Sequence, residues 1–238
     1  MIAEELLRAG KLDEAVETLT AELRENPLDA KRRTFLFELL CFSGEYGRAE
    51  KQLQALAEAN QDRALGVLLY RAALHAEKAR HELFENKRYP ADGAQPRPIS
   101  GTLNGKPFQS LSDADQRIGA RLEVFAAGDY LWVRLEHVAS IEMEPPKRLR
   151  DLLWIPARVR TGPAFKGQDL GEVLLPVLSP FTWQHPDGAV RLGRTTEWCQ
   201  DDTGEVSPYG QKTLNVDGEE FPLLELRRLE IQTPEQSN

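Results

Sequence analysis

The chain has 238 residues, 41% of them apolar and 29% charged, which is enough to build one large or two small packed domains. Its formal net charge of −8 argues against a nucleic-acid partner, because affinity for phosphates comes from clustered Lys and Arg. The sequence has no run of about 18 apolar residues, and its start, MIAEELLRAG, lacks the basic-then-apolar order of a signal peptide, so we expect a cytoplasmic protein without a membrane partner.

The start of the chain repeats itself after 34 residues, from Gly10 to Gly44. The matched positions are Gly10, Leu12, Ala15 and Leu19 in the first unit and Gly44, Tyr46, Ala49 and Leu53 in the second. This is the period of tetratricopeptide repeats, in which a small residue lets two helices approach and a large one fills the space opposite. Stacked helix pairs of this kind leave a concave surface for another chain, so the repeat predicts a binding protein.

Helical periodicity places five segments in the first half of the chain. A truncated helix is expected over residues 1–9, a second carries Ala15 to Leu23 and ends before Pro27, a third covers 32–42, and a fourth carries Ala49 and Leu53. The fifth has an apolar stripe formed by Leu65, Leu68, Leu69, Ala72, Ala73 and Ala76, and runs through Leu83 toward Tyr89-Pro90. Because about three repeats are needed for a stable array, we expect the last helix to be covered by the rest of the chain or by a partner, and we expect a rigid joint between the halves.

A connection rich in Pro and Gly follows these helices. We therefore predict a tetratricopeptide-like helical domain over residues 1–85, a connection over 86–100 and a second domain over 101–238. Beyond the connection the apolar period approaches two, which predicts a hairpin from 122–126 and 130–135 around Gly128-Asp129. Further strands are expected at 140–143, 152–159, 172–178 and 189–198, with a closing hairpin at 215–219.

Prolines interrupt this second half at Pro145-Pro146 and Pro156, which favours a strongly bent sheet or a partial barrel. The fold class predicted is α+β in two parts, an N-terminal α-α superhelix followed by a mostly β C-terminal domain.

Six motifs in the second half occur in a fixed order. They are SGTLNGKPF (100–108), DADQRIG (113–119), EPP with LRDLLW (144–154), RTTEW (194–198), YGQK (209–212) and PLLELRRLEI (222–231). Together, and downstream of the repeat, they resemble the ImpE/TagJ family, SciE-type accessory proteins of bacterial type VI secretion.

The resemblance implies a non-enzymatic adaptor without a cofactor. It implies binding of the N-terminal helix of the small contractile-sheath subunit and, through that subunit, association with the ClpV-type ATPase that disassembles contracted sheaths. We interpret the motif residues as structural; they are Asp113, Asp115, Arg117, Gly119, Glu144, Pro145, Pro146, Arg150, Asp151, Trp154, Glu197, Trp198, Gly210 and Gln211.

Helix face and repeat position suggest which residues would line a groove for an amphipathic partner helix. The apolar candidates are Phe35, Phe37, Leu40, Phe42 and Tyr70, and Arg32, Arg33 and Arg71 are the candidates to meet acidic flanks.

Other polar residues have simpler interpretations than catalysis or metal binding. Asp113 with Gln116 fits a capping box at a short helix, and Arg117 is placed to pair with Asp115. Glu77 and His81, spaced i, i+4, are interpreted as a solvated polar face rather than as metal ligands.

Several remaining features are also interpreted as structural. The glycine-rich segment 162–171 lacks the order of a phosphate-binding loop, and both cysteines are expected to be buried apolar residues. At least three of the four tryptophans are expected in the core, and Arg194, Glu197, Arg227 and Arg228 are expected to form ion pairs across strands. Two alternatives stay open: a small-ligand or metal-dependent enzyme with a pocket in the C-terminal domain, and a self-associating scaffold.

Overall fold

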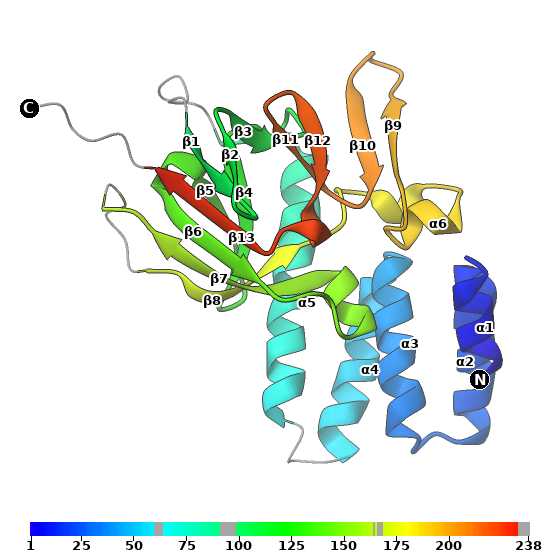
Figure 1. Ribbon diagram of the computed structural model, residues 1–238. Coiled ribbons are helices and arrows are strands. Elements are labelled where there is room, and N and C mark those ends of the chain that lie inside the picture. Colours follow the sequence, from blue (N-terminus) through cyan, green and yellow to red (C-terminus); the bar gives the residue numbers. More distant parts are fainter. Residues whose placement is uncertain (60–63, 91–98, 164, 166–168, 233–238) are drawn as a thin grey trace, which may run out of the picture.

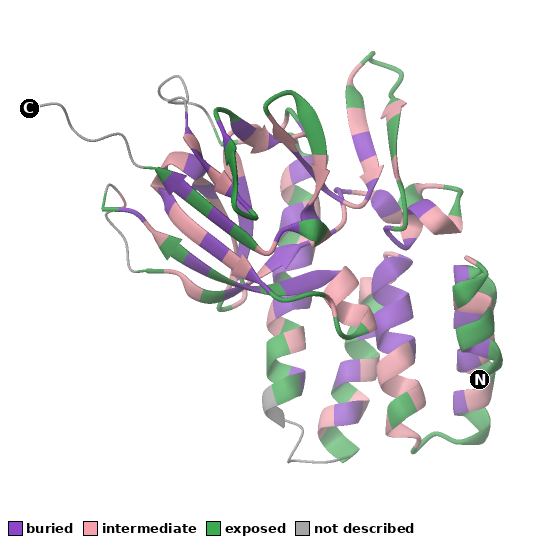
Figure 2. Ribbon diagram, in the orientation of Figure 1, coloured by how far each residue is buried: buried purple, intermediate pink, exposed green. Residues whose placement is uncertain are grey.

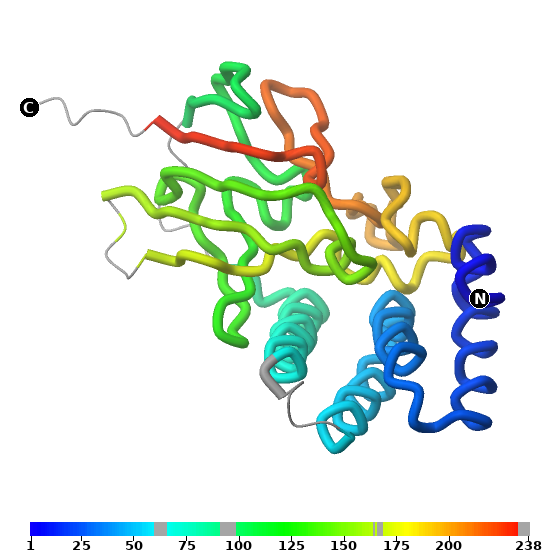
Figure 3. Tube along the Cα trace, turned by 60° about the horizontal axis from the view of Figure 1, so that its bottom comes forward, coloured from blue at the N-terminus to red at the C-terminus, as the bar shows by residue number. Residues whose placement is uncertain are grey.

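The computed structural model describes residues 1–59, 64–90, 99–163, 165 and 169–232, and these include five successive helices at the start of the chain. They are α1 (Ile2–Arg8), α2 (Leu12–Glu25), α3 (Ala30–Phe42), α4 (Tyr46–Ala59) and α5 (Ala64–Glu85). The helices stand in a row, with α1 and α2 at one end and α5 at the other, beneath the β structure (Figures 1 and 3). None of the described helices is long and apolar enough to cross a membrane.

The repeat seen in the sequence determines how these helices pack. Ala15 and Leu19 of α2 and their counterparts Ala49 and Leu53 of α4 are all at most 1% exposed. The matched glycines Gly10 and Gly44 both lie at turns between helices and adopt left-handed backbone, with φ of +78° and +71°. The N-terminus of α3 is capped by the Asp29 carboxylate, which accepts hydrogen bonds from two backbone amides.

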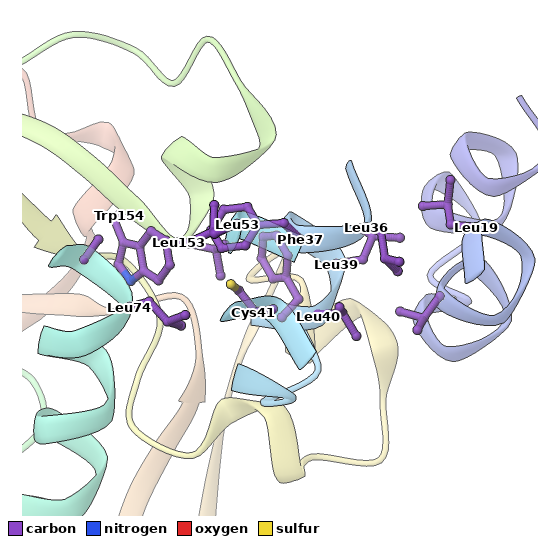
Figure 4. Close-up of a cluster of buried hydrophobic side chains, with 14 of the residues drawn as sticks. Leu19, Leu36, Phe37, Leu39, Leu40, Cys41, Leu53, Leu74, Leu153 and Trp154 are labelled. Atoms are coloured by element: carbon purple, nitrogen blue, oxygen red, sulfur yellow. The ribbon is translucent and has the colours of Figure 1, made fainter. Parts of the chain in front are cut away.

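The core of the helical half extends into the second half. Figure 4 shows Leu36, Phe37, Leu39, Leu40 and Cys41 of α3 between Leu19 on one side and Leu74, Leu153 and Trp154 on the other. Leu153 and Trp154 belong to the second half, so the two halves share this core.

The second half is largely antiparallel β structure. Its eight-stranded sheet has the order β2-β1-β13-β6-β7-β8-β4-β5, a second sheet has the order β12-β11-β3, and β9 pairs with β10. The strands are β1 (Ser100–Leu103), β2 (Lys106–Phe108), β3 (Leu111–Asp113), β4 (Arg121–Ala126), β5 (Asp129–Arg134), β6 (Val138–Met143), β7 (Trp154–Thr161), β8 (Gly171–Pro176), β9 (Thr196–Gln200), β10 (Val206–Gly210), β11 (Thr213–Val216), β12 (Glu219–Pro222) and β13 (Arg228–Gln232).

The two larger sheets enclose a second core. Val124 and Ile141 of the eight-stranded sheet and Leu111 and Leu214 of the three-stranded sheet belong to one buried apolar cluster. Figure 2 shows the alternation of buried and exposed residues along these strands. The predicted fold class, a tetratricopeptide-like helical part followed by a mostly β part, is confirmed.

The sequence misplaced some details of the β half. A strand was expected over 189–198, but the chain forms α6 (Gly188–Arg191), capped by Asp187, before β9 begins at Thr196. The turn between β4 and β5 uses Ala127 and Gly128, one residue earlier than predicted, and both have positive φ. The β1–β2 hairpin was not predicted, although Asn104-Gly105 at its turn is a strong hairpin pattern.

The β half covers the last helix and also the loops of the helical half. α5 packs against β5, and a Cβ added to Gly44 would lie 2.4 Å from the ring of Trp183. Near Gly10, Arg191 of α6 pairs with Asp13 of α2 at 2.8 Å, and a Cβ on Gly188 would lie 1.9 Å from the Gly10 carbonyl oxygen. The prediction that the last helix is covered holds for the later turns of α5, where Ala76 and Phe84 are buried, but not for its earlier turns, where Leu68 and Leu69 are exposed. Residues 91–98 of the predicted connection lie outside the described residues.

Candidate partner-binding cleft

An open cleft of about 610 Å³ lies between α3, α4, α5 and the short helix η3 (Leu149–Leu152) of the second half. Its walls come from both halves of the chain. The residues that line it are Ala30, Lys31, Thr34, Phe35, Phe37, Glu38, Leu53, Leu56, Gly66, Val67, Tyr70, Arg148, Leu149 and Arg150. A cleft of this size, mostly apolar with a few charged groups, suits an apolar segment of a partner better than a small polar ligand.

Aromatic rings form one side of the cleft. The ring centroid of Phe37 lies 5.9 Å from that of Tyr70 and 6.4 Å from that of Trp154. Phe37 is fully buried and forms the floor, whereas Phe35 and Tyr70 are half-buried and accessible from the cleft.

One ion pair crosses from the helical half to η3 at the edge of the cleft. Nε of Arg150 lies 3.1 Å from Oε1 of Glu38, and the Arg150 guanidinium stands 4.7 Å from the ring centroid of Tyr70. Burial raises the pKa of Glu38 to about 7, although Arg150 opposes that rise.

The structure brings together three of the five apolar residues predicted to line a groove. Phe35, Phe37 and Tyr70 line the cleft. Leu40 and Phe42 instead face the helical core, where they are at most 1% exposed. Leu40 lies on the face of α3 turned away from the cleft. Phe42, seven residues after Phe35, is on the same side as the cleft lining but at the C-terminal end of the helix, where it lines a separate cavity of about 20 Å³. The apolar pattern of α3 does not provide this distinction, because apolar residues fill most of its last turns.

The three predicted arginines do not line the cleft. Arg32 pairs with Glu22 and Asp29, and Arg33 donates to Gln52 and to the Pro27 carbonyl. Arg71 is exposed on α5. The cations that do line the cleft are Lys31, Arg148 and Arg150. Lys31, in the first turn of α3, and Arg148 were not predicted to line a groove, and Arg150 was assigned a structural role. For Arg148 and Arg150 the reason is that nothing in the linear sequence brings η3 beside α3.

A buried network of charges joins α5 to the β half. Arg80 of α5 donates to both carboxylate oxygens of Glu123 in β4, at 2.7 and 3.0 Å. Lys212 bonds the same carboxylate and also lies 2.6 Å from Asp113. All four side chains are at most 6% exposed. We call these four residues, Arg80, Asp113, Glu123 and Lys212, the joint network.

Each charge in the joint network has an opposite charge beside it. Burial raises the pKa of Glu123, but Arg80 and Lys212 outweigh burial and leave that pKa below its usual range. Burial raises the pKa of Asp113 to about 6, against the opposing effect of Lys212. The network therefore consists of closely matched charges that hold two elements together.

Glu77 and His81 were expected on a solvated face, and this prediction is wrong. The Glu77 carboxylate is buried, accepts a hydrogen bond from Trp154 at 2.7 Å and pairs with Arg80 and His81. Burial raises the pKa of Glu77, but Arg80 and the hydrogen bonds from His81 and Trp154 lower it to about 2. His81 also contacts the Tyr46 hydroxyl at 2.8 Å. These residues hold α5 against α4 and β7.

The Asp113 segment forms a turn rather than the short helix expected. Its predicted ion pair is confirmed, because Arg117 Nη2 lies 2.6 Å from Asp115 Oδ2. The Asp113 carboxylate accepts from the Asp115 amide at 2.9 Å, and the Gly119 carbonyl accepts from the Asp113 amide. Glycine suits position 119 because its φ is +61°.

Most other motif residues hold turns and loops. Asp151 accepts from the amides of Lys147 and Arg148 and so caps η3, and Trp154 is buried. Gly210 approaches the Thr195 carbonyl so closely that a Cβ would lie 2.0 Å away, and Gln211 donates to the Gly193 carbonyl. Glu144 and Pro145 line an open depression of about 600 Å³ on the sheet, and Pro146 follows them half-buried.

The tryptophan and cysteine predictions are only partly right. Trp154 alone of the four tryptophans is fully buried, and Trp198 is 40% exposed and donates to Glu220. Cys41 is buried, but Cys199 is half-buried. Leu68 and Leu69, assigned to the apolar stripe of the last helix, are 63% and 51% exposed.

The cross-strand ion pairs expected for four residues form only in part. Arg228 lies 4.0 Å from Glu142 across β13 and β6, and Glu197 lies 3.4 Å from His185. Arg194 instead donates to the Leu7 and Arg8 carbonyls at the end of α1, and Arg227 donates to nearby backbone carbonyls. Residues 164 and 166–168 of the glycine-rich segment lie outside the described residues.

An enzyme would need a closed pocket with converging polar groups in the second half. Asp113, Glu123 and Lys212 do converge on an enclosed cavity there, but its volume is about 20 Å³, room for about one water molecule. Within the described part of the chain, no group of three or more His, Cys, Asp or Glu side chains is arranged to hold a metal ion.

Comparisons with known proteins agree with this architecture. The ImpE protein family model matches residues 105–230, and a tetratricopeptide repeat model matches residues 6–74. The type VI secretion system accessory component TagJ of Pseudomonas aeruginosa is 34% identical over 265 residues, covering 98% of this chain and 92% of TagJ. A crystal structure of a Vibrio parahaemolyticus protein has a TM-score of 0.85, with 98% of both chains covered at 22% identity, and so shares the fold.

Proposed function

Because this chain belongs to the ImpE family, we propose that it is an accessory component of a bacterial type VI secretion system and works as an adaptor without catalytic chemistry. In this proposal it binds the N-terminal amphipathic helix of the small contractile-sheath subunit. It works in the cytoplasm and reaches the ClpV-type disassembly ATPase through that subunit. Family membership and the name of the Pseudomonas relative support the secretion role.

The observation that carries the binding role is the open cleft beside α3 and α5. It presents accessible aromatic rings at Phe35 and Tyr70 beside the buried ring of Phe37. An amphipathic helix buries its apolar anchors, spaced i, i+3, i+4 and i+7, in a groove of this kind.

Two glycines allow the cleft to be blocked without disturbing the core. Gly66, in the first turn of α5, lines the cleft, and a Cβ there would meet open space. Gly47, in the first turn of α4, is equally open but is not among the residues that line the cleft. The variants Gly66→Trp and Gly47→Trp therefore add the same side chain in similar helical positions, one inside the cleft and one outside it.

The test is a titration of each protein with a labelled peptide that matches the N-terminal helix of the cognate small sheath subunit. We expect wild type and Gly47→Trp to bind equally and Gly66→Trp to bind at least about tenfold more weakly, since an added indole excludes an anchor worth about 1.4 kcal/mol or more. Failure of wild type to bind at high micromolar concentration, or equal binding by both variants, would contradict the proposal.

The ATPase link has a separate test. When the purified ATPase and this protein are mixed, we expect them to co-elute only if the small sheath subunit is present. Co-elution without the sheath subunit would replace the proposed indirect link by a direct one, and no co-elution in either mixture would remove the link.

A further inference from the structure

Arg150 differs from the other motif residues of the second half because its side chain lines the cleft. Short helix η3 carries it across the boundary between the halves, so that it lies over the Tyr70 ring of α5 and beside Glu38 of α3. Its side chain is 18% exposed. It is therefore largely desolvated and still accessible from the open side of the cleft.

The guanidinium of Arg150 has N–H donors that are available for further hydrogen bonds. A guanidinium carries five N–H donors. Arg150 Nε is near Glu38, but it lacks the alignment for a hydrogen bond, and the guanidinium makes no hydrogen bond to any of the residues that the structure describes. Arg80 shows the contrast: its guanidinium donates to Glu123 twice and to Glu77 once. Of the Arg150 nitrogens, Nε is buried without a hydrogen bond, whereas the two Nη groups are not among the buried unpaired atoms and so can donate to an acceptor that enters the cleft.

The charge of the cleft also favours an incoming acid. Lys31 and Arg148 are exposed on its walls, so that three cations line it, and Glu38 is the acid among the described lining residues. Because burial raises the pKa of Glu38 to about 7, that carboxyl neutralises Arg150 only partly near neutral pH. The cleft is thus locally positive on a chain whose formal net charge is −8.

From these contacts, and resting on the proposed function, we propose that Arg150 is a specificity-determining residue that binds a carboxylate of the partner helix. The partner is then an amphipathic helix that places an Asp or Glu beside its apolar anchors, with the carboxylate paired to the planar guanidinium fork. The anchors contact Phe35 and Tyr70 while the acid contacts η3, so the bound helix touches both halves of the chain.

The test uses three versions of the sheath-subunit peptide that differ only at the polar positions flanking its apolar anchors, which carry Glu, Gln or Lys. We expect wild type to prefer the Glu peptide over the Gln peptide by about tenfold or more, which is about 1.4 kcal/mol, since hydrogen bonds between charged groups are stronger than those to a neutral amide. In Arg150→Gln this preference should disappear, and in Arg150→Lys it should survive in part because a point charge remains.

Arg158→Gln is the matched control, because Arg158 is an exposed arginine on β7 that pairs with an exposed glutamate away from the cleft. It should keep the full preference for the Glu peptide. A purely structural role for Arg150 would weaken binding of all three peptides equally and leave the preference unchanged, which would overturn the inference.

The outcomes separate this inference from the proposed function. If Gly66→Trp blocks binding but wild type binds the Glu and Gln peptides equally, the cleft is correct and the role of Arg150 is wrong. If none of the peptides binds wild type, or if Gly66→Trp binds them normally, both proposals fail. A preference for the Lys peptide would show that Glu38 and not Arg150 selects the partner, and it would also overturn the inference.

Discussion

The joint network and the partner-binding cleft both place charged groups against apolar surroundings, but they treat those charges differently. In the joint, Arg80, Glu123, Lys212 and Asp113 are buried together and each has an opposite charge within hydrogen-bonding distance. In the cleft, Arg150 lies near Glu38 without a hydrogen bond to it.

The difference shows how buried charge can serve two purposes in one chain. A fully paired buried network fixes the relative position of the elements that carry it, because removing one member leaves another charge uncompensated. An incompletely paired charge beside an open apolar surface gains free energy when a partner pairs with it. We therefore assign a structural role to the joint network and a binding role to the cleft. The following variants test that assignment.

The largest loss of stability should come from a substitution in the joint network. Arg80→Met leaves Glu123 and Glu77 buried without their shared cation, and we expect the free energy of unfolding to fall by about 3–5 kcal/mol. Lys78→Met on the same helix is the control, because Lys78 makes an exposed pair with Glu50, and it should cost at most about 1 kcal/mol. Urea denaturation measures both, and a loss below about 1 kcal/mol for Arg80→Met would contradict the assignment.

A close contact between the helical half and the β half, outside the joint network, should give the next-largest loss of stability. In Gly44→Ala the new methyl group would lie 2.4 Å from the Trp183 ring, and the residue would also have to keep a left-handed backbone. We expect the free energy of unfolding to fall by about 2–4 kcal/mol. Gly10→Ala has a similar φ, but its nearest atom is 3.9 Å away, so only the backbone cost of about 1–2 kcal/mol should appear. If thermal or urea unfolding shows the same loss of unfolding free energy for Gly44→Ala and Gly10→Ala, then Trp183 moves aside without cost and the contact does not contribute.

The cleft predicts a pH effect centred on Glu38. Its pKa in the folded chain is about 7 and its reference value is 4.5. A raised carboxyl pKa means that the folded state binds the proton more tightly, so this contribution to stability is full below about pH 4.5 and is lost as pH rises toward 7. Glu38→Gln lacks the effect, and between pH 5 and pH 8 the stability of the variant relative to wild type should rise by about 2–3 kcal/mol.

Asp113 in the joint titrates in the same direction, with a pKa of about 6. The pH series therefore compares Glu38→Gln with wild type, in which the Asp113 contribution is common to both proteins and cancels. A difference in unfolding free energy that stays constant with pH would show that Glu38 does not keep a raised pKa in the folded chain.

The smallest loss of stability should come from substitution of Arg150, measured in the absence of a partner. Arg150→Gln removes the contact with the Tyr70 ring and the 3.1 Å ion pair with Glu38 but no hydrogen bond, and we expect the free energy of unfolding to fall by about 1 kcal/mol. Thermal unfolding without peptide measures it. A loss of unfolding free energy as large as that of Arg80→Met would show that Arg150 has a structural role and not a binding role.

The helical half could be predicted because its determinants are local. Turn glycines with left-handed backbone and the pairs Ala15 with Leu19 and Ala49 with Leu53 recur at a fixed period. Strands β4 to β8 of the eight-stranded sheet followed from alternation and turn residues in the same way, whereas β1, β2 and β13 of that sheet were not predicted. The exceptions were segments such as 189–198, where Asp187 caps a short helix and Gly193 ends it.

The joint network could not be predicted because its members are distant in sequence. Glu77 and Arg80 look like an ordinary exposed helical pair until Glu123, 43 residues after Arg80, packs against them. One indication was present: Glu123 interrupts an apolar strand between Leu122 and Val124. A charged residue on a buried strand requires an opposite charge, and a search for one would have led to α5.

The cleft was predicted in part for a similar reason. Phe35, Phe37 and Tyr70 follow from the helical repeat, whereas Arg148 and Arg150 enter the cleft only because the β half packs over the helices. Composition alone cannot give the position of η3 beside α3. The sequence thus indicated a groove in the helical half but not the contribution of the second half to it.

Amide hydrogen exchange of the full-length chain, measured with and without a saturating amount of the sheath-subunit peptide, tests the central claim most directly. We expect added protection in the first turns of α5 and in η3, on both sides of the cleft, and little change at β3 and β4, which carry Asp113 and Glu123 of the joint network. Protection confined to the sheets of the second half, with α5 and η3 unchanged, would contradict it.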